Sequence, residues 1–238
     1  MEKYEFLLED RIAKIQAINN EYDLEKNGYP FKSKEHSLRV EQFNKGLNSN
    51  YIKKYITGYD KDGKPSKFIC PKILMYQFNE KGRYNFSNKC CYKLKKEPIH
   101  KWEKQNKRSI GITGMRAEEG GNRARLGCTI FKGSKLYHFH PLIVVSEEWE
   151  EEFIEKEKII LCKLYYPPYN FRRTGCRACP YAIELQKELE KLKAFMPHEY
   201  KAAELLWKPV YDEYRRIGYR LKKEVNYQYN IFDFKESK

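Results

Sequence analysis

Four of the seven cysteines have types and spacing that suit one shared inorganic centre. Cys90 and Cys91 are adjacent, and Cys176 and Cys179 form a CxxC motif. A CxxC places two thiolates within reach of a single metal, and four thiolates suit either tetrahedral zinc or a [4Fe–4S] cluster. Adjacent cysteines are an awkward pair for zinc because neighbouring side chains point apart, and a larger cubane relaxes that constraint. The alternative is a pair of small hydrophobic residues and an unrelated surface CxxC.

The composition favours a basic protein that keeps its thiols reduced. Lys and Arg number 47 against 33 Asp and Glu, so the 238 residues carry a formal net charge of +14. This excess favours an anionic partner such as a nucleotide, a nucleic acid or an acidic protein surface. An odd number of cysteines, with no apolar signal segment at residues 1–5, predicts a cytoplasmic protein without a disulfide framework. The longest aliphatic run, residues 142–145, is far shorter than the roughly 20 residues of a spanning helix, so we expect no membrane partner.

Short strands alternating with helices predict an α/β fold with a helical C-terminal portion. Apolar spacing indicates helices at 2–19, 91–107, 183–195 and 198–218, and strands at 109–114 and 138–145. Pro98 is expected to divide the second of these helices, because proline cannot donate a backbone hydrogen bond. Ser146 is placed to cap an acidic helix that follows it.

Charged residues are segregated along the chain. Residues 89–108 contain eight basic residues against two glutamates, and residues 147–157 contain seven glutamates against one lysine. Each run is compatible with a solvated helix face and also with a partner of opposite charge.

Several motifs around the cysteines occur in an order typical of one family. They are SNKCCYKLKKEP at 87–98, GITGMRAEEGGNRAR at 111–125, FHPL at 139–142 and YYPPYNFRRTGCRACPYA at 165–182. In this order they resemble the phosphoadenosine phosphosulfate (PAPS) reductase family, and its uncharacterised bacterial and phage-type members more than its assimilatory reductases. The resemblance runs from GYPFKSKEHS at 28–37 to WKPVYDEYRRIGY at 207–219. It implies an adenine nucleotide alpha-hydrolase-like fold with a PP-loop, Rossmann-like sheet.

The resemblance implies a metal site. In the iron–sulfur members of this family, the double cysteine and the CxxC together hold a [4Fe–4S] cluster. The resemblance therefore assigns Cys90, Cys91, Cys176 and Cys179 as cluster ligands, with zinc as the alternative metal.

The resemblance also implies a nucleotide or sulfonucleotide site around the RAEE stretch. Arg116 leaves a strand end, where open α/β sheets bind ligands, and a guanidinium can hold a phosphate bidentately. Glu118 and Glu119 could orient this arginine or hold a ribose hydroxyl, and the alternative for all three is a surface ion-pair network. Positive potential for sulfate or phosphate would come from the lysines beside the double cysteine: Lys89, Lys93, Lys95 and Lys96.

The three remaining cysteines are expected to be buried thiols. Of Cys70, Cys128 and Cys162, the first two are the candidates for spare ligands. His140, which precedes a proline, is expected to be a hydrogen-bonded strand end rather than an acid or base.

The sequence departs from the family at two places. Members carry a phosphate-binding loop, Ser-Gly-Gly-Lys-Asp-Ser or close to it, after the first strand, and this chain has no such segment. The first β-loop-α-β stretch looks absent, with the joint near Asn27–Gly28. The reductases also attack the sulfonucleotide with a C-terminal cysteine, whereas residues 183–238 contain no thiol.

These observations predict three regions: an N-terminal helix at 1–27, a truncated α/β domain with the four-cysteine site at 28–182, and a helical region and tail at 183–238. The first hypothesis is a PAPS reductase-like [4Fe–4S] protein without autonomous reductase activity, which a complementing subunit could complete. The second is a non-catalytic basic module that binds nucleic acid or a nucleoprotein complex, such as a phage-encoded inhibitor of host defence. The third is a reductase whose nucleotide-binding half is supplied in trans.

Overall fold

The computed structural model describes residues 24–171, 176 and 178–223. The chain divides into two compact units. The first unit combines the chain up to Lys96 with the chain from Arg173 onward, and the second unit is Glu97–Arg172. The helix predicted at 2–19 and the C-terminal tail lie outside the described residues. The predicted boundaries at residues 27 and 182 stay predictions.

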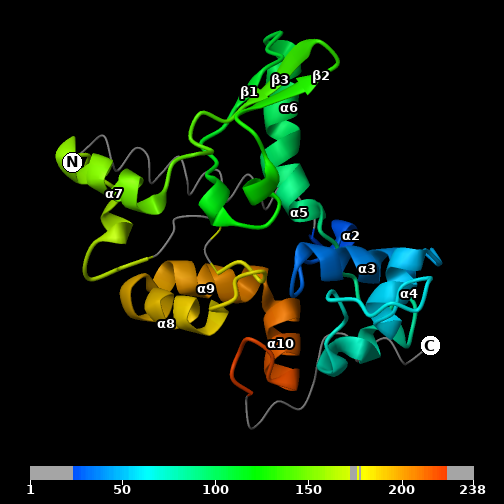
Figure 1. Cartoon of the computed structure of the whole chain (residues 1–238). Helices are drawn as coiled ribbons and strands as arrows, with labels where there is room; N and C mark the ends of the chain where they lie inside the picture. Colours follow the sequence, from blue (N-terminus) through cyan, green and yellow to red (C-terminus); the bar gives the residue numbers. More distant parts are fainter. Residues whose placement is uncertain (1–23, 172–175, 177, 224–238) are drawn as a thin grey trace. The chain divides into compact units, whose positions relative to one another are not determined.

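The described part of the first unit consists of helices and loops (Figure 1). Its helices are α2 (Leu24–Asn27), α3 (Lys34–Asn44), α4 (Asn50–Thr57), a 3₁₀ helix (Lys72–Phe78), α5 (Lys89–Cys91), a π-helical turn (Tyr92–Lys96), α8 (Leu185–Phe195), α9 (Pro197–Leu206) and α10 (Lys208–Ile217). Serine side chains begin two of them, because Ser33 accepts a hydrogen bond from the His36 amide and Ser49 accepts one from the Ile52 amide.

The core of the first unit joins segments from both ends of the chain. The Phe31 ring lies 4.3 Å from the Phe86 ring and 4.6 Å from the Tyr214 ring of α10, measured between centroids. Other fully or nearly fully buried apolar side chains in this core are Val40, Leu74, Leu185, Leu189, Leu192, Val210 and Tyr211. Burial of several such side chains, at about 1.5–3 kcal/mol each, is what holds the two chain segments together.

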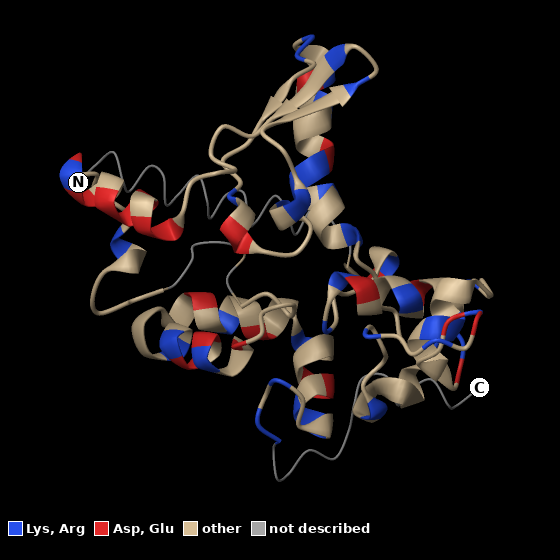
Figure 2. Cartoon of the chain, viewed as in Figure 1, with Lys and Arg blue, Asp and Glu red and all other residues tan. Residues whose placement is uncertain are grey.

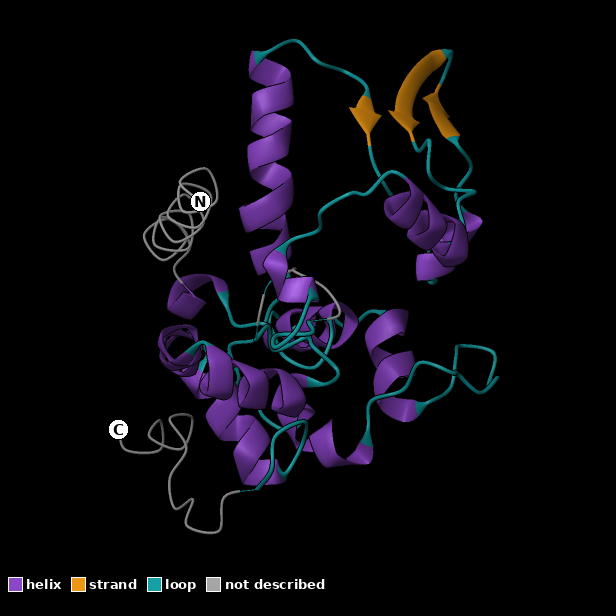
Figure 3. Cartoon of the chain, turned by 90° about the vertical axis from the view of Figure 1, so that its left-hand side faces the viewer, coloured by secondary structure: helices purple, strands orange, loops and turns teal. Residues whose placement is uncertain are grey.

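The second unit carries the sheet, as Figure 3 shows. Its elements are α6 (Glu97–Gln105), β1 (Gly111–Ile112), a 3₁₀ helix (Ala117–Glu119), a second 3₁₀ helix (Arg123–Arg125), β2 (Thr129–Lys132), β3 (Lys135–Phe139), α7 (Glu147–Lys156) and a third 3₁₀ helix (Lys163–Tyr165). The strand order is β1-β3-β2, with β1 parallel to β3 and β2 antiparallel to it. Helices combined with this mixed sheet confirm the predicted α/β class.

Several local predictions are confirmed. Ser146 caps α7, accepting a hydrogen bond from the Trp149 amide at 3.1 Å. The apolar stripe expected between residues 183 and 195 forms the buried face of α8. No helix in the described part of the chain is long and apolar enough to cross a membrane.

Two local predictions are wrong. The run 138–145 is a strand only as far as Phe139, because Pro141 cannot donate to a ladder and residues 141–144 form a turn. The helix expected at 198–218 ends at Leu206 and restarts at Lys208, just before Pro209. The division expected at Pro98 is confirmed to within two residues, because the π-helical turn ends at Lys96 and α6 begins at Glu97 with proline in its first turn.

A buried histidine makes the first unit sensitive to acid. The two ring nitrogens of His36 lie 3.0 Å from the Tyr55 hydroxyl and 2.7 Å from the Gln77 side-chain oxygen. Burial is the main cause that lowers the pKa of His36 to about 4, and the charges of Lys32 and Arg220 act in the same direction. In the unfolded chain this group has a pKa of 6.5, so between pH 6.5 and 4 the unfolded state binds more protons.

We therefore expect the free energy of unfolding to fall as pH is lowered from 6.5 toward 4, with His36 contributing about 3 kcal/mol over the whole range. Urea unfolding at a series of pH values measures this, and His36→Gln should flatten the slope. His100→Gln is the matched control, because His100 is exposed on α6. Equal slopes for the wild type and His36→Gln would contradict the assignment.

Candidate metal centre

The double cysteine lies at the start of a helix. Cys90 is buried and Cys91 is half-buried on α5, which continues into the π-helical turn. The Cys90 thiol donates a hydrogen bond to the Cys91 sulfur, and this bond, together with burial, raises the pKa of Cys90. The same hydrogen bond lowers the pKa of Cys91 against the effect of its burial, and the ammonium groups of Lys34 and Lys95 add to this. Cys91 is therefore the thiol of the pair that gives up its proton more readily.

The CxxC segment is fastened by α10 and the residues after it. Ala178 is fully buried and has a left-handed backbone, with φ of +52°. Its carbonyl accepts a hydrogen bond from the Tyr211 hydroxyl, and the Pro180 carbonyl accepts hydrogen bonds from Tyr214 at 2.9 Å and Arg220 at 2.6 Å. These donors satisfy buried carbonyls that a tight loop leaves without secondary-structure partners.

One tyrosine links the two cysteine-bearing segments. The Tyr181 hydroxyl lies 3.2 Å from the Ser87 carbonyl oxygen and 3.3 Å from the Ser37 hydroxyl oxygen. Ser87 also donates to the Asn27 carbonyl at 2.6 Å. The chain just after the CxxC is thus tied to the chain just before the double cysteine.

Three of the four predicted ligands, Cys91, Cys176 and Cys179, influence the protonation of Lys95. The Lys95 ammonium hydrogen-bonds to Cys176, and the pKa of Lys95 is raised by charge at Cys176 first, and also at Cys91 and Cys179. Burial raises the pKa of Cys179 to about 11, and charge at Cys176 and Cys91 acts in the same direction. Cysteines from both predicted pairs therefore lie near enough to affect one another's protonation, and their assignment as ligands of one centre stays a prediction.

The chemistry of this donor set fits a thiolate-bound metal. Four thiols with two ammonium groups beside them can supply sulfur ligands whose negative charge is offset. Among the described residues, no three His, Cys, Asp or Glu side chains are grouped as closely as ligands of one ion. The thiols here make hydrogen bonds to each other and to lysine, so metal binding would have to exchange these contacts for bonds of about 2.3 Å.

The predicted lysines have different surroundings. Lys89 lies 3.0 Å from the Glu41 carboxylate, which also pairs with Lys45 at 2.6 Å. Lys93 is exposed on the π-helical turn. Lys34 donates a hydrogen bond to Cys91 and was missed by the sequence reasoning. The only feature of the sequence that pointed to Lys34 was its position in the GYPFKSKEHS segment, where the family resemblance begins.

The RAEE residues form an ion-pair and capping network within the second unit. Arg116 lies 3.0 Å from Glu150 of α7 and 3.6 Å from Glu118. The Glu118 carboxylate accepts a hydrogen bond from the Glu147 amide at 2.6 Å, and the Glu119 carboxylate accepts one from the Arg116 amide at 3.1 Å. This network anchors the first turn of α7. It agrees with the alternative interpretation of these residues as a surface ion-pair network. The assignment of these residues to a nucleotide stays a prediction.

The other singled-out residues are partly as expected. Cys70 is buried, as predicted. The prediction is wrong for Cys128 and Cys162, which are exposed because they lie in segments between the strands and helices. His140 is buried, with its amide bonded to the Cys128 carbonyl at 2.6 Å and its ring 2.7 Å from the Thr113 hydroxyl. The expectation of a hydrogen-bonded strand end is confirmed for His140.

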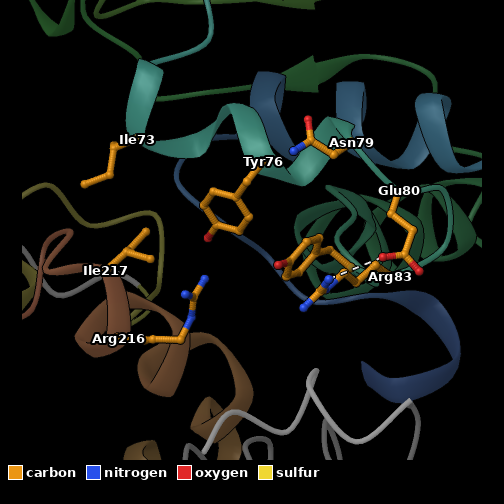
Figure 4. A pocket seen from close by; sticks show the side chains of 8 residues that line it. Ile73, Tyr76, Asn79, Glu80, Arg83, Arg216 and Ile217 are labelled. Carbon is orange, nitrogen blue, oxygen red and sulfur yellow. Dashed lines mark hydrogen bonds and ion pairs between the residues drawn. The ribbon is translucent and has the colours of Figure 1, made fainter. Parts of the chain in front are cut away.

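A pocket of about 310 Å³ lies in the first unit between the 3₁₀ helix Lys72–Phe78 and the end of α10 (Figure 4). None of the predicted site residues lines it. Arg216 makes two hydrogen bonds of 2.8 Å to Glu213, whose side chain is fully buried, and Tyr76 also donates to this carboxylate. The polar groups of this pocket therefore neutralise a buried charge, which is strongly destabilising when left unpaired.

Comparison with known proteins identifies the family. Residues 40–182, more than half of the chain, match the phosphoadenosine phosphosulfate reductase domain. The chain therefore belongs to the PAPS reductase family, as its motifs predicted, and the matched range contains all four clustered cysteines. No match was found among curated proteins or among solved structures.

Removing the Tyr181 hydroxyl should loosen the joint between the two cysteine segments. We expect Tyr181→Phe to lower the free energy of unfolding by about 1 kcal/mol, the usual net value of a partly buried hydrogen bond. Urea unfolding of the reduced protein measures the change, and Tyr51→Phe is the control because Tyr51 is exposed on α4. Equal stability of the Tyr181→Phe variant and the wild type would show that the joint is held by packing alone.

Proposed function

We propose that this member of the PAPS reductase family holds a [4Fe–4S] cluster on Cys90, Cys91, Cys176 and Cys179 and does not reduce sulfonucleotides by itself. The observation that carries the proposal is the electrostatic interaction of Lys95 with Cys91 of one pair and with Cys176 and Cys179 of the other. Cysteines that served only as small hydrophobic residues would have no reason to gather around a cation. The positive charge of a lysine does not stabilise neutral thiols, whereas it stabilises thiolate ligands by electrostatic attraction.

The arrangement of the thiols favours a cluster over zinc. Cys90 and Cys91 are neighbours on one helix, and a cubane offers separate iron atoms to their two sulfurs. A single zinc ion needs all four sulfurs at about 2.3 Å in a tetrahedron. The cluster, when bound, would supply a redox-active and electron-withdrawing inorganic centre in a basic environment.

Lys34 and Lys95 would have a defined place in this centre. Both hydrogen-bond to a predicted ligand, Lys34 to Cys91 and Lys95 to Cys176. Hydrogen bonds and positive charge at the ligating sulfurs stabilise the thiolate form and shift the reduction potential of a cluster. The two lysines would therefore hold the cluster and set its electronic properties.

The reductive step lacks its attacking group in this polypeptide. Residues 180–238 contain no cysteine, and the four predicted ligand thiols would be occupied by the metal. A sulfonucleotide would also lack the backbone amides and lysine of a phosphate-binding loop. We therefore propose a cluster protein that acts with a partner or as a binding module.

Anaerobically purified protein should be brown, with broad absorbance near about 400 nm and about four iron and four sulfide per chain. Alanine substitution of any of the four ligands should abolish the absorbance after reconstitution with iron and sulfide. Cys128→Ala and Cys162→Ala should keep it, because these two exposed cysteines lie outside the proposed set. Circular dichroism of each variant checks that the fold persists.

Two outcomes would reject the cluster. One is a protein that stays colourless after reconstitution or binds only zinc. The other is a cluster that survives in both Cys90→Ala and Cys176→Ala, since its ligands would then lie elsewhere.

The polypeptide of residues 1–238, loaded with its cluster, should form no sulfite from PAPS or from adenosine phosphosulfate with a reduced thioredoxin as electron donor. The physical reason is the missing nucleophilic thiol, without which no covalent thiosulfonate can form. Sulfite release over many turnovers would contradict this prediction while leaving the cluster proposal untouched.

A further inference from the structure

The pocket between the 3₁₀ helix Lys72–Phe78 and the end of α10 has no part in the metal centre. Its volume of about 310 Å³ lies at the lower end of the range of small-molecule pockets. In Figure 4, Ile73 and Tyr76 of the 3₁₀ helix face Ile217 and Arg216 of α10 across this space. All of these residues belong to the first unit, so the pocket is a feature of one compact body.

Two guanidinium groups line the pocket together with aromatic rings. The Arg216 guanidinium carbon lies 5.3 Å from the centroid of the Tyr76 ring. The Arg83 guanidinium carbon lies 5.7 Å from the centroid of the Tyr84 ring. Glu213 holds Arg216 in place through two hydrogen bonds of 2.8 Å. Because unpaired nucleic-acid bases stack on aromatic rings and on guanidinium planes, this lining suits a flat ring.

The other lining residues suit a base with polar edges. The apolar side chains of Ile73 and Ile217 lie at one end of the pocket, and the exposed Asn79 and Glu80 lie at the other end (Figure 4). Amide and carboxylate side chains are groups that hydrogen-bond to base edges. Glu80 lies 3.3 Å from Arg83 in an exposed ion pair, which a ligand displaces at little cost.

Exposed lysines surround the pocket. Lys72 and Lys81 directly precede and follow the lining segment 73–80, and neither makes an ion pair with another described residue. Lys223 lies beside the end of α10, since its Cβ is 3.7 Å from the position that a Cβ would take at Gly218. Figure 2 shows the chain that follows α10 as basic. These cations are placed to attract the phosphates on either side of one base.

We propose that this surface of the first unit binds a single strand of nucleic acid, with one unpaired base in the pocket and its neighbouring phosphates at Lys72, Lys81 and Lys223. Phe68, four residues before Lys72, is 78% exposed and offers a ring to a second base. A strand uses successive stacking sites, whereas an acidic peptide would use the lysines and leave the stacking groups without a role. The inference goes beyond the proposed function and does not depend on the metal centre.

Fluorescence anisotropy of a labelled oligothymidylate of about 15 residues measures this binding to the full chain. Three neutralised phosphates predict about a twentyfold loss of affinity between about 50 and 200 mM salt. Lys72→Gln with Lys81→Gln should weaken binding and reduce this salt effect to about threefold. Lys101→Gln with Lys104→Gln, which removes two exposed charges from α6, is the matched control and should keep the full salt effect.

A strand of the same length made of abasic sites separates recognition of bases from recognition of phosphates. It should bind at least about fivefold more weakly than the oligothymidylate, because the stacking is lost. Arg83→Ala and Phe68→Ala should each weaken binding of the oligothymidylate and leave binding of the abasic strand nearly unchanged. Phe131→Ala, which removes a 59% exposed ring from β2, is the matched control and should change neither. Circular dichroism checks that each variant is folded.

Several outcomes would overturn the proposal. The first is no binding at about 50 mM salt. The second is equal affinity for the abasic strand or for a duplex of the same sequence, whose bases are stacked within the helix. The third is full competition by thymidine monophosphate at the same concentration of bases, since the pocket would then serve a free nucleotide. The last is binding to vesicles of anionic phospholipid without binding to the oligothymidylate.

Discussion

Among the buried side chains that join the two segments of the first unit, Tyr214 makes both a ring contact and two hydrogen bonds. Its ring packs against Phe31, while its hydroxyl accepts a hydrogen bond from the Lys32 amide at 2.6 Å and donates one to the Pro180 carbonyl at 2.9 Å. Lys32 and Pro180 belong to chain segments between which the whole second unit is inserted. Joining such segments costs loop-closure entropy, which grows only slowly with loop length, so a few well-buried contacts suffice to offset it. This junction and the Tyr181 contacts with Ser37 and Ser87 give the CxxC and the double cysteine a common scaffold.

The electrostatics of the cysteine site follow from this junction. Lys34 stands at the start of α3, two residues after Lys32, and Lys95 stands on the π-helical turn after Cys91. Because the two lysines approach different sulfurs, Cys91 and Cys176, they can offset charge on both cysteine segments at once. A π-helical turn is rare and often marks a functional site, since its extra residue redirects side chains that a regular helix would space evenly. Here it follows directly on the adjacent cysteines and carries Lys95.

The sequence allowed the family and the α/β class to be predicted, because these depend on residue types at fixed local spacing, whereas the joint use of the two cysteine motifs stays a prediction. Local signals were also sufficient for the Ser146 cap and the α8 stripe. The contact of Lys34 with Cys91 could not be predicted, because it depends on how Phe31, Phe86 and Tyr214 pack. The run at 138–145 predicted a longer strand than the structure contains. Its β propensity was outweighed by the missing amide hydrogen of Pro141, which cannot donate to a sheet.

Arg116 shows how a motif residue can have two competing uses. Its guanidinium lies 3.0 Å from Glu150 and 3.6 Å from Glu118, and Glu118 also holds the Glu147 amide. A phosphate at this arginine would have to displace partly exposed carboxylates, and such ion pairs are worth only about 0–1 kcal/mol each. The displacement is therefore energetically accessible to a dianionic ligand, but it would release the first turn of α7 from its anchor. Arg116 contacts Glu150 through its Nε atom, so a phosphate bound at the same guanidinium would compete with the carboxylates that hold α7, and anion binding at the RAEE stretch and the anchoring of α7 are linked through one side chain.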